Sequence, residues 1–439
     1  MPSSEAEIAL SFAPVVKAAA PAVVNIYARR VVESRRRSPF AGDPFFERFF
    51  RGLMPEGRRV QNALGSGVVV SSDGLVVSNH HVVGGAEEIR VVLADKREFD
   101  AELLLSDPDS DLAVLRLEDA EGLPALPLRT GPPPEVGDLV LAIGNPFGVG
   151  QTVTSGIVSA LARQGTSPAG AAGYYIQTDA AINPGNSGGA LVDMAGRLVG
   201  VNTAILSRSG GSNGVGFAIP AALVRQVTMQ AAEGRHTLAR PWVGLGGQPV
   251  DAAMAEALGL ATPEGLIVSE IHPLSPFAEA GLQRGDVLLA IDGAPVSGPA
   301  ELDFRLAALG LGAEVRVEWV RPERGRRDAV IRLGPAPEEP PRDPRRLDGP
   351  GPFAGLEVAT LNPALAEQLG VPYHAEGAVV LDPGPTGARA GFREGDLIRA
   401  VNGRAVRGSA ELEGLAGRLG RVGEVVVERD GRRGVLRFR

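Results

Sequence analysis

An internal repeat in the C-terminal half limits the possible folds of this chain more than any other feature. The sequence GLQRGDVLLAIDG at 281–293 recurs as GFREGDLIRAVNG at 391–403, an offset of 110 residues, and AEL at 300–302 recurs at 410–412 with the same offset. Two copies at so long a period indicate a tandem domain of roughly 90 residues rather than a solenoid, which stacks more and shorter units. The chain is therefore expected to end in two copies of one module.

A proline-rich segment separates the two copies. Residues 335–352 (PAPEEPPRDPRRLDGPGP) hold seven prolines in 18 positions. Proline-rich segments form extended, semi-rigid spacers. We therefore expect a stiff, exposed linker, with the first module at 236–334 and the second at 353–439.

Upstream of residue 235, the sequence predicts short strands separated by turns. Runs of β-branched residues alternate with dipeptides such as Asp73-Gly74, which favours the positive φ of a hairpin. The 58 glycines and 35 prolines of the chain disfavour long helices, and one terminal helix is expected at 220–233. This pattern indicates a mainly β fold built of antiparallel barrels or a sandwich. The expected strands span residues 67–71, 75–79, 89–93, 98–105, 112–117, 139–143, 154–161, 175–178, 190–193 and 197–202.

Residue usage excludes several classes of function. The chain has no cysteine, which rules out disulfides, thiolate metal sites and cysteine nucleophiles. Its five histidines lack the HxxxH and HExxH spacings of zinc hydrolases, so we expect no metal and no cofactor. A net charge of −8 without a basic tract argues against nucleic-acid binding. No long uncharged apolar run is present, so no integral membrane segment is expected.

A glycine-rich pentapeptide, GNSGG at 185–189, surrounds Ser187. Glycines on both sides let the backbone turn tightly, expose the serine Oγ and aim successive N–H groups at one point. The alternative is an ordinary serine in a glycine-rich turn. A serine nucleophile needs a base that is oriented by a carboxylate. Candidates for both lie upstream, in SNHHVV at 78–83 and DPDSDLAVL at 107–115.

The order histidine, aspartate, serine is that of chymotrypsin-like double barrels. GNSGG also satisfies the G-x-S-x-G pattern of α/β-hydrolases, which need a helix after the serine and a histidine downstream. Here ALVDMAGRLVGVN at 190–202 predicts a strand, a turn and a second strand, and no histidine follows Ser187 before His236. The hydrolase alternative therefore fails.

These segments resemble the HtrA (Deg) family of serine proteases, and the repeated module resembles the PDZ domains that follow the protease domain in that family. The resemblance implies a chymotrypsin-like protease domain at 1–235 and two PDZ-like α+β domains. It also implies an ATP-independent endopeptidase with chaperone-like protein quality control, commonly assembled as a trimer or a multiple of trimers. The segments that carry it are SNHHVV, DLAVL at 111–115, TDAAINPGNSGGAL at 178–191, VNTAI at 201–205 and GVGFAIP at 214–220.

The family's motifs assign the catalytic residues of this chain. They select His81 rather than His80 as the general base, Asp111 as the carboxylate that orients it, and Ser187 as the nucleophile. On a strand, adjacent side chains face opposite sides, so only one of the two histidines could reach Ser187. Periodicity alone does not choose between them, and His80 stays the alternative.

The surroundings of the nucleophile suggest how substrate would be held. The oxyanion hole is expected at the backbone N–H groups of Gly185, Asn186 and Ser187. The S1 pocket is expected to be lined by Ala181, Ile182 and Ile205, unless these apolar side chains are simply core. Without a carboxylate at the pocket base, a preference for Lys or Arg is not expected. Other nearby acids have structural interpretations: Asp179 in the family's TDAAI frame, and Asp107 and Asp109 as turn or surface carboxylates.

In each PDZ-like module, an extended peptide would add a strand beside a helix, and loop N–H groups would hold its terminal carboxylate. Leucines at helical spacing predict these helices at 302–309 and 412–419. Gly285-Asp286 and Gly395-Asp396 are interpreted as turn architecture. The carboxylate loops are expected at Trp242, Val243, Gly244 and Leu245 in the first copy and at 353–356, with Gly355 and Leu356, in the second.

The resemblance also implies partners and a location. Unfolded proteins and C-terminal peptides are the expected partners. The family indicates the periplasm or cell envelope, whereas the first residues, MPSSEAE, lack the basic start and apolar stretch of a secretory signal. The chain is therefore either cytoplasmic or one from which a leader has been removed.

Residues 33–62, rich in Phe and Arg, predict a mobile loop that is either collapsed on the surface or in contact with another subunit or the active site.

The rival to an active protease is a non-proteolytic holding chaperone or PDZ scaffold whose triad stays latent. The presence of all three triad residues favours the protease.

Overall fold

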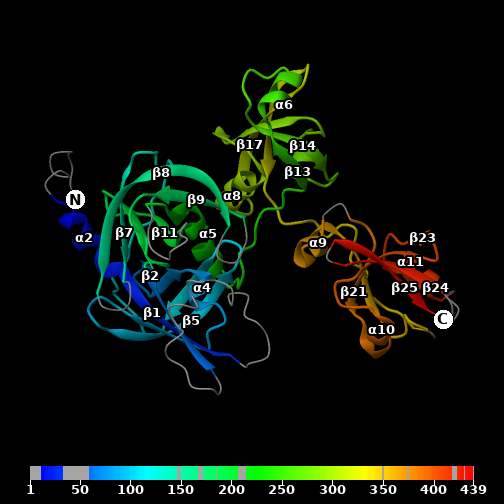
Figure 1. Cartoon of the computed structure of the whole chain (residues 1–439), viewed down its shortest axis with the longest axis horizontal. Coiled ribbons are helices and arrows are strands. Elements are labelled where there is room, and N and C mark those ends of the chain that lie inside the picture. Colours follow the sequence, from blue (N-terminus) through cyan, green and yellow to red (C-terminus); the bar gives the residue numbers. More distant parts are fainter. Residues whose placement is uncertain are drawn as a thin grey trace. The chain divides into compact units, whose positions relative to one another are not determined.

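The fold is taken from a computed structural model of the chain. It describes residues 11–32, 59–145, 150–166, 172–183, 185–205, 214–348, 351–372, 375–417, 423–429 and 431–438. These residues form two compact units (Figure 1). The first unit consists of residues up to Arg240 together with Ala300–Gly310, and the second of Pro241–Pro299 and Leu311–Arg439.

The first unit contains two closed antiparallel barrels of six strands each, and several of these strands are labelled in Figure 1. The order is β1-β2-β3-β6-β5-β4 in one barrel and β10-β11-β12-β9-β8-β7 in the other. Strands such as β4 alternate exposed and buried residues, as expected when one face packs on a core. The strands are β1 (Val23–Val32), β2 (Arg59–Ser71), β3 (Leu75–Ser78), β4 (Glu88–Val92), β5 (Glu98–Asp107), β6 (Leu112–Leu117), β7 (Leu139–Gly144), β8 (Thr152–Thr166), β9 (Ala172–Thr178), β10 (Ala190–Asp193), β11 (Leu198–Ile205) and β12 (Gly216–Pro220).

The expected mainly β class and chymotrypsin-like double barrel are confirmed. Each of the ten expected strands overlaps a strand of the structure, and the helix expected at 220–233 is α5 (Ala221–Ala232). α2 (Ala13–Ala19) and the 3₁₀ turn η1 (Ala20–Ala22) precede β1. β2 begins at Arg59, so the end of the loop expected at 33–62 is a strand. The rest of that loop, 33–58, lies outside the described residues.

One helix from the first copy of the repeat belongs to the first unit. In α8 (Pro299–Leu309), Phe304 stacks on Tyr174 of β9 with ring centroids 4.2 Å apart and an interplanar angle of 7°. Gln226 on α5 donates from Nε2 to two carbonyls of the last turn of α8, at 3.0 and 3.1 Å. Carbonyls at a helix C-terminus lack intrahelical partners, so this amide satisfies groups that would otherwise need water. The stretch expected as one module, 236–334, thus contributes to both units.

The first PDZ-like module has an antiparallel sheet with the order β13-β14-β15-β17-β18, in which β16 pairs with β15. β13 is the end strand of this order, so one of its edges carries no partner strand among the described residues. The elements are β13 (Leu245–Pro249), α6 (Ala252–Ala257), β14 (Leu266–Ile271), α7 (Pro276–Glu279), β15 (Val287–Ile291), β16 (Ala294–Pro295), β17 (Glu314–Arg321) and β18 (Gly325–Arg332).

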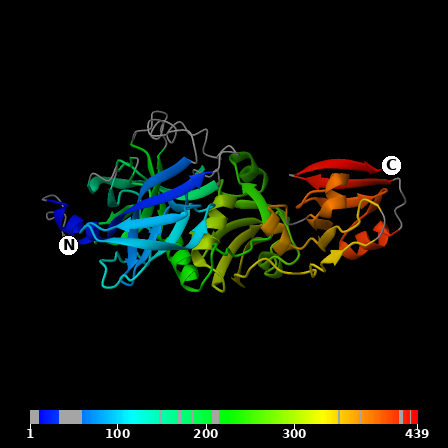
Figure 2. The same ribbon diagram turned by 90° about the horizontal axis from the view of Figure 1, so that it is seen from below.

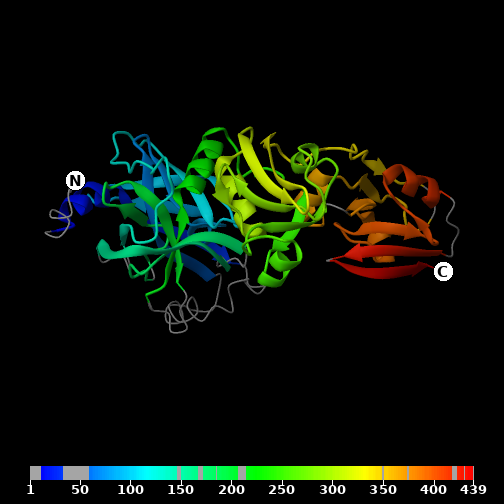
Figure 3. The ribbon, with the colours of Figure 1, turned by 90° about the horizontal axis from the view of Figure 1, so that it is seen from above.

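The second PDZ-like module repeats this plan with one additional strand. Its order is β19-β20-β21-β22-β24-β25, and β23 pairs with β22. Figures 2 and 3 show the module from two sides, with β24 and β25 in red at the far end of the chain. The elements are β19 (Arg345–Arg346), β20 (Glu357–Thr360), α9 (Pro363–Leu369), β21 (Ala378–Asp382), α10 (Gly384–Ala390), β22 (Leu397–Val401), β23 (Arg404–Ala405), α11 (Ser409–Ala416), β24 (Gly423–Arg429) and β25 (Arg432–Phe438).

The additional strand comes from the segment expected to be an exposed linker, and that expectation is wrong for part of it. β19 pairs with β20, and the following Leu347 is only 1% exposed. A strand at a sheet edge uses the N–H groups of alternate residues only, so the proline before β19 is tolerated there. Extended proline-rich chain is therefore as suited to a sheet edge as to a spacer.

Candidate active site

Asp111 lies just before β6, held between His81 and Thr203. Its carboxylate oxygens are 2.8 and 2.9 Å from His81 Nδ1, and one accepts a hydrogen bond from Thr203 Oγ1 at 2.5 Å. The residue is 1% exposed and has a φ of +57°, which Asp tolerates better than most residues. Burial alone would raise the pKa of Asp111, but His81 and the hydrogen bonds hold that pKa below its ordinary value. The ionised carboxylate orients the imidazole.

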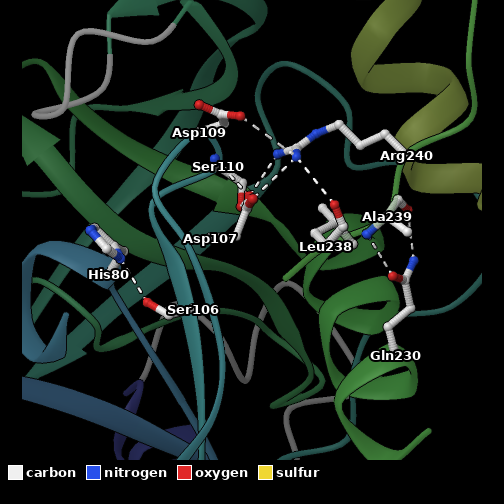
Figure 4. Close-up of polar contacts among 9 residues, drawn as sticks. All are labelled: His80, Ser106, Asp107, Asp109, Ser110, Gln230, Leu238, Ala239 and Arg240. Atoms are coloured by element: carbon white, nitrogen blue, oxygen red, sulfur yellow. Dashed lines mark hydrogen bonds and ion pairs between the residues drawn. The ribbon is translucent and has the colours of Figure 1, made fainter. Parts of the chain in front are cut away.

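The two histidines lie on a short helical turn, α4 (His80–Val83), rather than on a strand. The expectation that they face opposite sides of a strand is therefore wrong in its premise, although successive helical residues, about 100° apart, still point differently. His80 Nδ1 lies 2.7 Å from Ser106 Oγ, and Figure 4 draws this contact. His81 instead contacts Asp111. Burial lowers the pKa of His80, which is therefore neutral at pH 7.

Ser187 lies in the turn between β9 and β10, and its Oγ donates to the backbone carbonyl of Thr203 at 3.0 Å. Within the described residues, it makes no hydrogen bond to His81. The structure thus brings Asp111 and His81 into direct contact, whereas Ser187 is connected to Asp111 through Thr203. This role of Thr203 was missed, because a threonine in VNTAI carries no signal that separates it from an ordinary strand residue.

The backbone around Ser187 is fixed by the first barrel. Ser66 on β2 donates from its N–H to the carbonyl of Ser187 at 2.9 Å and from its Oγ to the carbonyl of Gly185 at 2.6 Å. Of the three amides expected in the oxyanion hole, that of Asn186 donates to the Asn183 carbonyl. The amides of Gly185 and Ser187 have no partner among the described residues. Gly185 has a φ of +93°, which glycine adopts without strain.

The apolar residues expected to line the S1 pocket divide into three cases. Ile182 is 1% exposed and packs in the core of the second barrel, so it is a core residue beneath the expected pocket. Ala181 is partly exposed, and its carbonyl accepts a hydrogen bond from Thr154 Oγ1 at 2.9 Å. The side chain of Ile205 lies outside the described ones. Asp179 accepts the Ile157 N–H at 2.7 Å, a structural contact to β8.

Asp107 closes the turn that leads to Asp111. Its carboxylate accepts the N–H of Ser110 at 2.9 Å and a two-pronged contact from the guanidinium of Arg240, at 3.1 and 2.6 Å (Figure 4). Asp107 is 3% exposed, whereas Asp109 is exposed and lies 3.8 Å from Arg240. A bidentate arginine fixes carboxylate geometry strongly. The turn that presents Asp111 is therefore anchored by the segment that leaves the protease barrels.

The loop expected to hold a peptide carboxylate in the first module has free amides. Trp242 is 7% exposed, and its N–H donates to the Gly334 carbonyl at 2.8 Å. The carbonyl of Val243 accepts Ser275 Oγ at 2.7 Å, and that of Gly244 accepts the His272 N–H at 2.7 Å. Within the described residues, the N–H groups of Val243 and Gly244 have no acceptor, and Leu245 starts β13 beside them. Two amide donors of this loop are thus unpaired within the described residues.

In the corresponding loop of the second module, 353–356, three of the four amides are hydrogen-bonded. The amide of Ala354 donates to the Gly351 carbonyl, that of Gly355 to the Leu347 carbonyl, and that of Leu356 to the Phe353 carbonyl. The two loops were expected to act alike, and the structure places their amides in different environments.

Two further observations concern metals and membranes. The described part of the chain contains no group of three His, Asp or Glu side chains arranged to hold a metal ion. No helix within those residues is both long and apolar enough to cross a bilayer.

Comparison with known proteins identifies the two types of domain. A model described as a trypsin-like peptidase domain matches residues 65–201, and a PDZ-domain model matches residues 267–321. Among solved structures, the HtrA-type protease AlgW with a decapeptide is 42% identical with a TM-score of 0.53, and the match covers 74% of this chain and 99% of that one.

Curated relatives extend the match over most of the chain. A probable periplasmic serine protease, do/HhoA-like, from Haemophilus influenzae is 37% identical over 419 residues, which are 92% of this chain and 86% of the relative. The periplasmic serine endoprotease DegP of Escherichia coli K12 is 38% identical over 380 residues, 85% of this chain and 76% of DegP. With the double barrel and the PDZ sheets, this identity shows that the chain belongs to the HtrA/DegP family of serine endoproteases.

Proposed function

We propose that the chain hydrolyses peptide bonds through Ser187, His81 and Asp111, with an acyl-enzyme on Ser187. The observation that carries this proposal is the buried, ionised Asp111 on His81 Nδ1, because it leaves Nε2 as the nitrogen that can take a proton. Ser187 Oγ attacks the scissile carbonyl while its proton passes to His81, which then protonates the leaving amine. Water repeats the sequence and releases the acyl group. The N–H groups of Gly185 and Ser187 would stabilise the oxyanion.

A resting state with low activity follows from the position of Ser187 Oγ. Ser187 Oγ donates to the Thr203 carbonyl at 3.0 Å rather than to His81. Rotation of the Ser187 side chain would exchange that hydrogen bond for one to His81 Nε2. This observation also favours the second candidate function, a non-proteolytic holding chaperone or PDZ scaffold in which the triad stays latent.

The proposed substrates are unfolded or misfolded proteins, degraded without ATP in protein quality control. Cleavage is proposed after small or medium aliphatic residues, because Ala181, Ile182 and Ile205 are apolar. The first PDZ-like module, with the free amides of Val243 and Gly244, would bind C-terminal peptides. By likeness to the relatives named as periplasmic proteases, we propose a periplasmic location and assembly as a trimer or a multiple of trimers.

Fluorophosphonate labelling of the full chain, followed by casein cleavage, separates the two functions. Ser187→Ala should abolish labelling and lower casein cleavage roughly 10⁴- to 10⁶-fold, and His81→Ala and Asp111→Asn should be nearly inactive. The matched control is His80→Ala, which removes the neighbouring imidazole that contacts Ser106. No labelling of the unaltered chain, even with unfolded protein present, would favour the chaperone.

One further outcome would contradict the assignment of the base. An inactive His80→Ala together with an active His81→Ala would show that His80, and not His81, is the general base.

The pocket proposal is tested by mapping cut sites on an unfolded protein with mass spectrometry. A majority of cuts after Lys or Arg would refute an apolar pocket.

A further inference from the structure

Residues 342–347, which we name the cover segment, lie along β20 of the second module. Arg345 pairs with Val358 and Arg346 with Glu357 in antiparallel register. The hydrogen bonds continue on both sides of these pairs: the Leu347 N–H donates to the Leu356 carbonyl at 2.8 Å, and the Gly355 N–H donates to the Leu347 carbonyl at 2.8 Å. The Thr360 N–H donates to the Arg342 carbonyl at 2.6 Å. The cover segment is therefore an added strand at the sheet edge.

The cover segment also contacts α11. Ser409, the first residue of that helix, donates from Oγ to the Asp343 carbonyl at 2.7 Å, and Arg345 pairs with Glu413 of the helix at 2.5 Å. In Figure 3, the orange-red α11 lies over one face of the module's orange and red strands. The segment thus occupies the place between strand and helix where PDZ-like modules take up an extended peptide.

The side chains of the cover segment alternate as those of a bound peptide would. Leu347 is 1% exposed and belongs to the same buried apolar cluster as Phe353, Leu356 and Leu412. Arg346 points outward, with 68% of its side chain exposed, and Arg345 turns back to Glu413. Leu347 thus fills the position of a C-terminal apolar residue, and its carbonyl takes the Gly355 amide that would otherwise hold a terminal carboxylate.

We propose that the cover segment closes the peptide site of the second module. The site is free for another chain only when the segment leaves, and its ligand class is an extended strand with a basic residue two positions before a last apolar one. The inference rests on the proposed peptide-binding role of these loops. A tethered segment competes at an effective concentration in the millimolar range, so free peptide at micromolar concentration does not displace it.

The test uses the full chain with Ser187→Ala, so that no probe is cleaved, and hydrogen exchange read by mass spectrometry. The probe is a synthetic peptide, EEPPRDPRRL, with a free C-terminal carboxylate. In the parent chain, we expect the amides of Gly355 and Thr360 to be protected and the peptide to add no protection there. In Leu347→Asp, both amides should exchange at least tenfold faster, and the peptide should restore their protection.

A matched control is Arg346→Asp, which places the same residue at the exposed neighbouring position and should behave like the parent chain. Equal exchange at Gly355 and Thr360 in the parent chain and in Leu347→Asp would overturn the proposal. Exposed amides in Leu347→Asp that the peptide fails to protect would instead overturn the peptide-binding role of this loop.

Leu347→Asp could unfold the whole module, which would show as lost protection in β21 and β22. In that case the proposal is tested with Arg345→Glu, which changes a partly exposed side chain. It should speed exchange at Gly355 and Thr360 several-fold, and Glu413→Arg in the same chain should reverse part of this effect. No change in Arg345→Glu would overturn the proposal.

Discussion

The two PDZ-like modules contain the same ion pair, formed by a buried aspartate and a partly exposed arginine, at matching positions. In the first, the guanidinium of Arg321 contacts both carboxylate oxygens of Asp286 at 2.8 Å and donates to the Gly281 carbonyl. In the second, Arg429 contacts both oxygens of Asp396 at 2.5 and 2.7 Å and donates to the Gly391 carbonyl. Each aspartate also accepts an N–H within its own turn, which fits its interpretation as turn architecture.

The modules differ at the edge of the sheet beside the carboxylate loop. β13 ends its sheet, whereas β20 carries β19. The difference does not come from the repeated sequence, because the cover segment precedes the second copy. A duplicated module can therefore keep its architecture while residues outside the duplication decide whether its binding edge is open.

The largest expected effect tests the shared part of the comparison. Arg321→Ala and Arg429→Ala should each destabilise their own module, because each removes the guanidinium that contacts both oxygens of a buried carboxylate. Asp286 and Asp396 are 2% and 0% exposed. Tryptophan fluorescence during urea unfolding reports the first module, which contains both tryptophans of the chain, and hydrogen exchange reports the second.

The control for this prediction removes both partners at once. Asp286→Asn with Arg321→Leu, and Asp396→Asn with Arg429→Leu, should cost less than the single arginine variants, since no unpaired charge stays buried. Destabilisation of one module and not of the other by the single arginine variants would show that the two ion pairs are not equivalent.

A smaller effect sharpens the difference between the two loops. Gly244 and Gly355 have φ values of +61° and +78°, so alanine at either position costs about 1–2 kcal/mol. A Cβ at Gly244 would lie 2.6 Å from the Trp242 ring, whereas at Gly355 the nearest atom is 3.9 Å away. Gly244→Ala should therefore lower the melting temperature more than Gly355→Ala does.

The same pair of variants separates an open site from a closed one. Gly244→Ala should weaken binding of a C-terminal peptide to the full chain with Ser187→Ala, measured by fluorescence anisotropy. Gly355→Ala should leave this affinity unchanged. An equal loss of affinity in both would mean that both edges accept peptide.

Strands and repeats were the predictable part of this fold, because both depend on local patterns. The run 112–117 matches β6 residue for residue, and the offset of 110 located both modules. The histidine pair was harder, because Asn79 ends the strand pattern one residue before α4, and four helical residues leave no periodic signal.

Contacts between distant segments were the unpredictable part. Thr203 meets Asp111 across 92 residues, and no local pattern announces such a contact. The cover segment was misjudged for a related reason: proline-rich composition predicts extended chain, and only the presence of a matching sheet edge decides whether that chain is exposed. The motifs around Ser187 selected the residues of the proposed triad, but they carry no information on the orientation of Ser187 Oγ.

Helix α8 has a consequence for how the protein is made. The first unit includes Ala300–Gly310, so its last residue leaves the ribosome 70 residues after Arg240. At synthesis rates of about 5–20 residues per second, the nascent barrels wait roughly 4–14 s for Phe304 to reach Tyr174 and for Gln226 to meet its carbonyls. Translation thus delays completion of the protease until most of the first PDZ-like module has been synthesised.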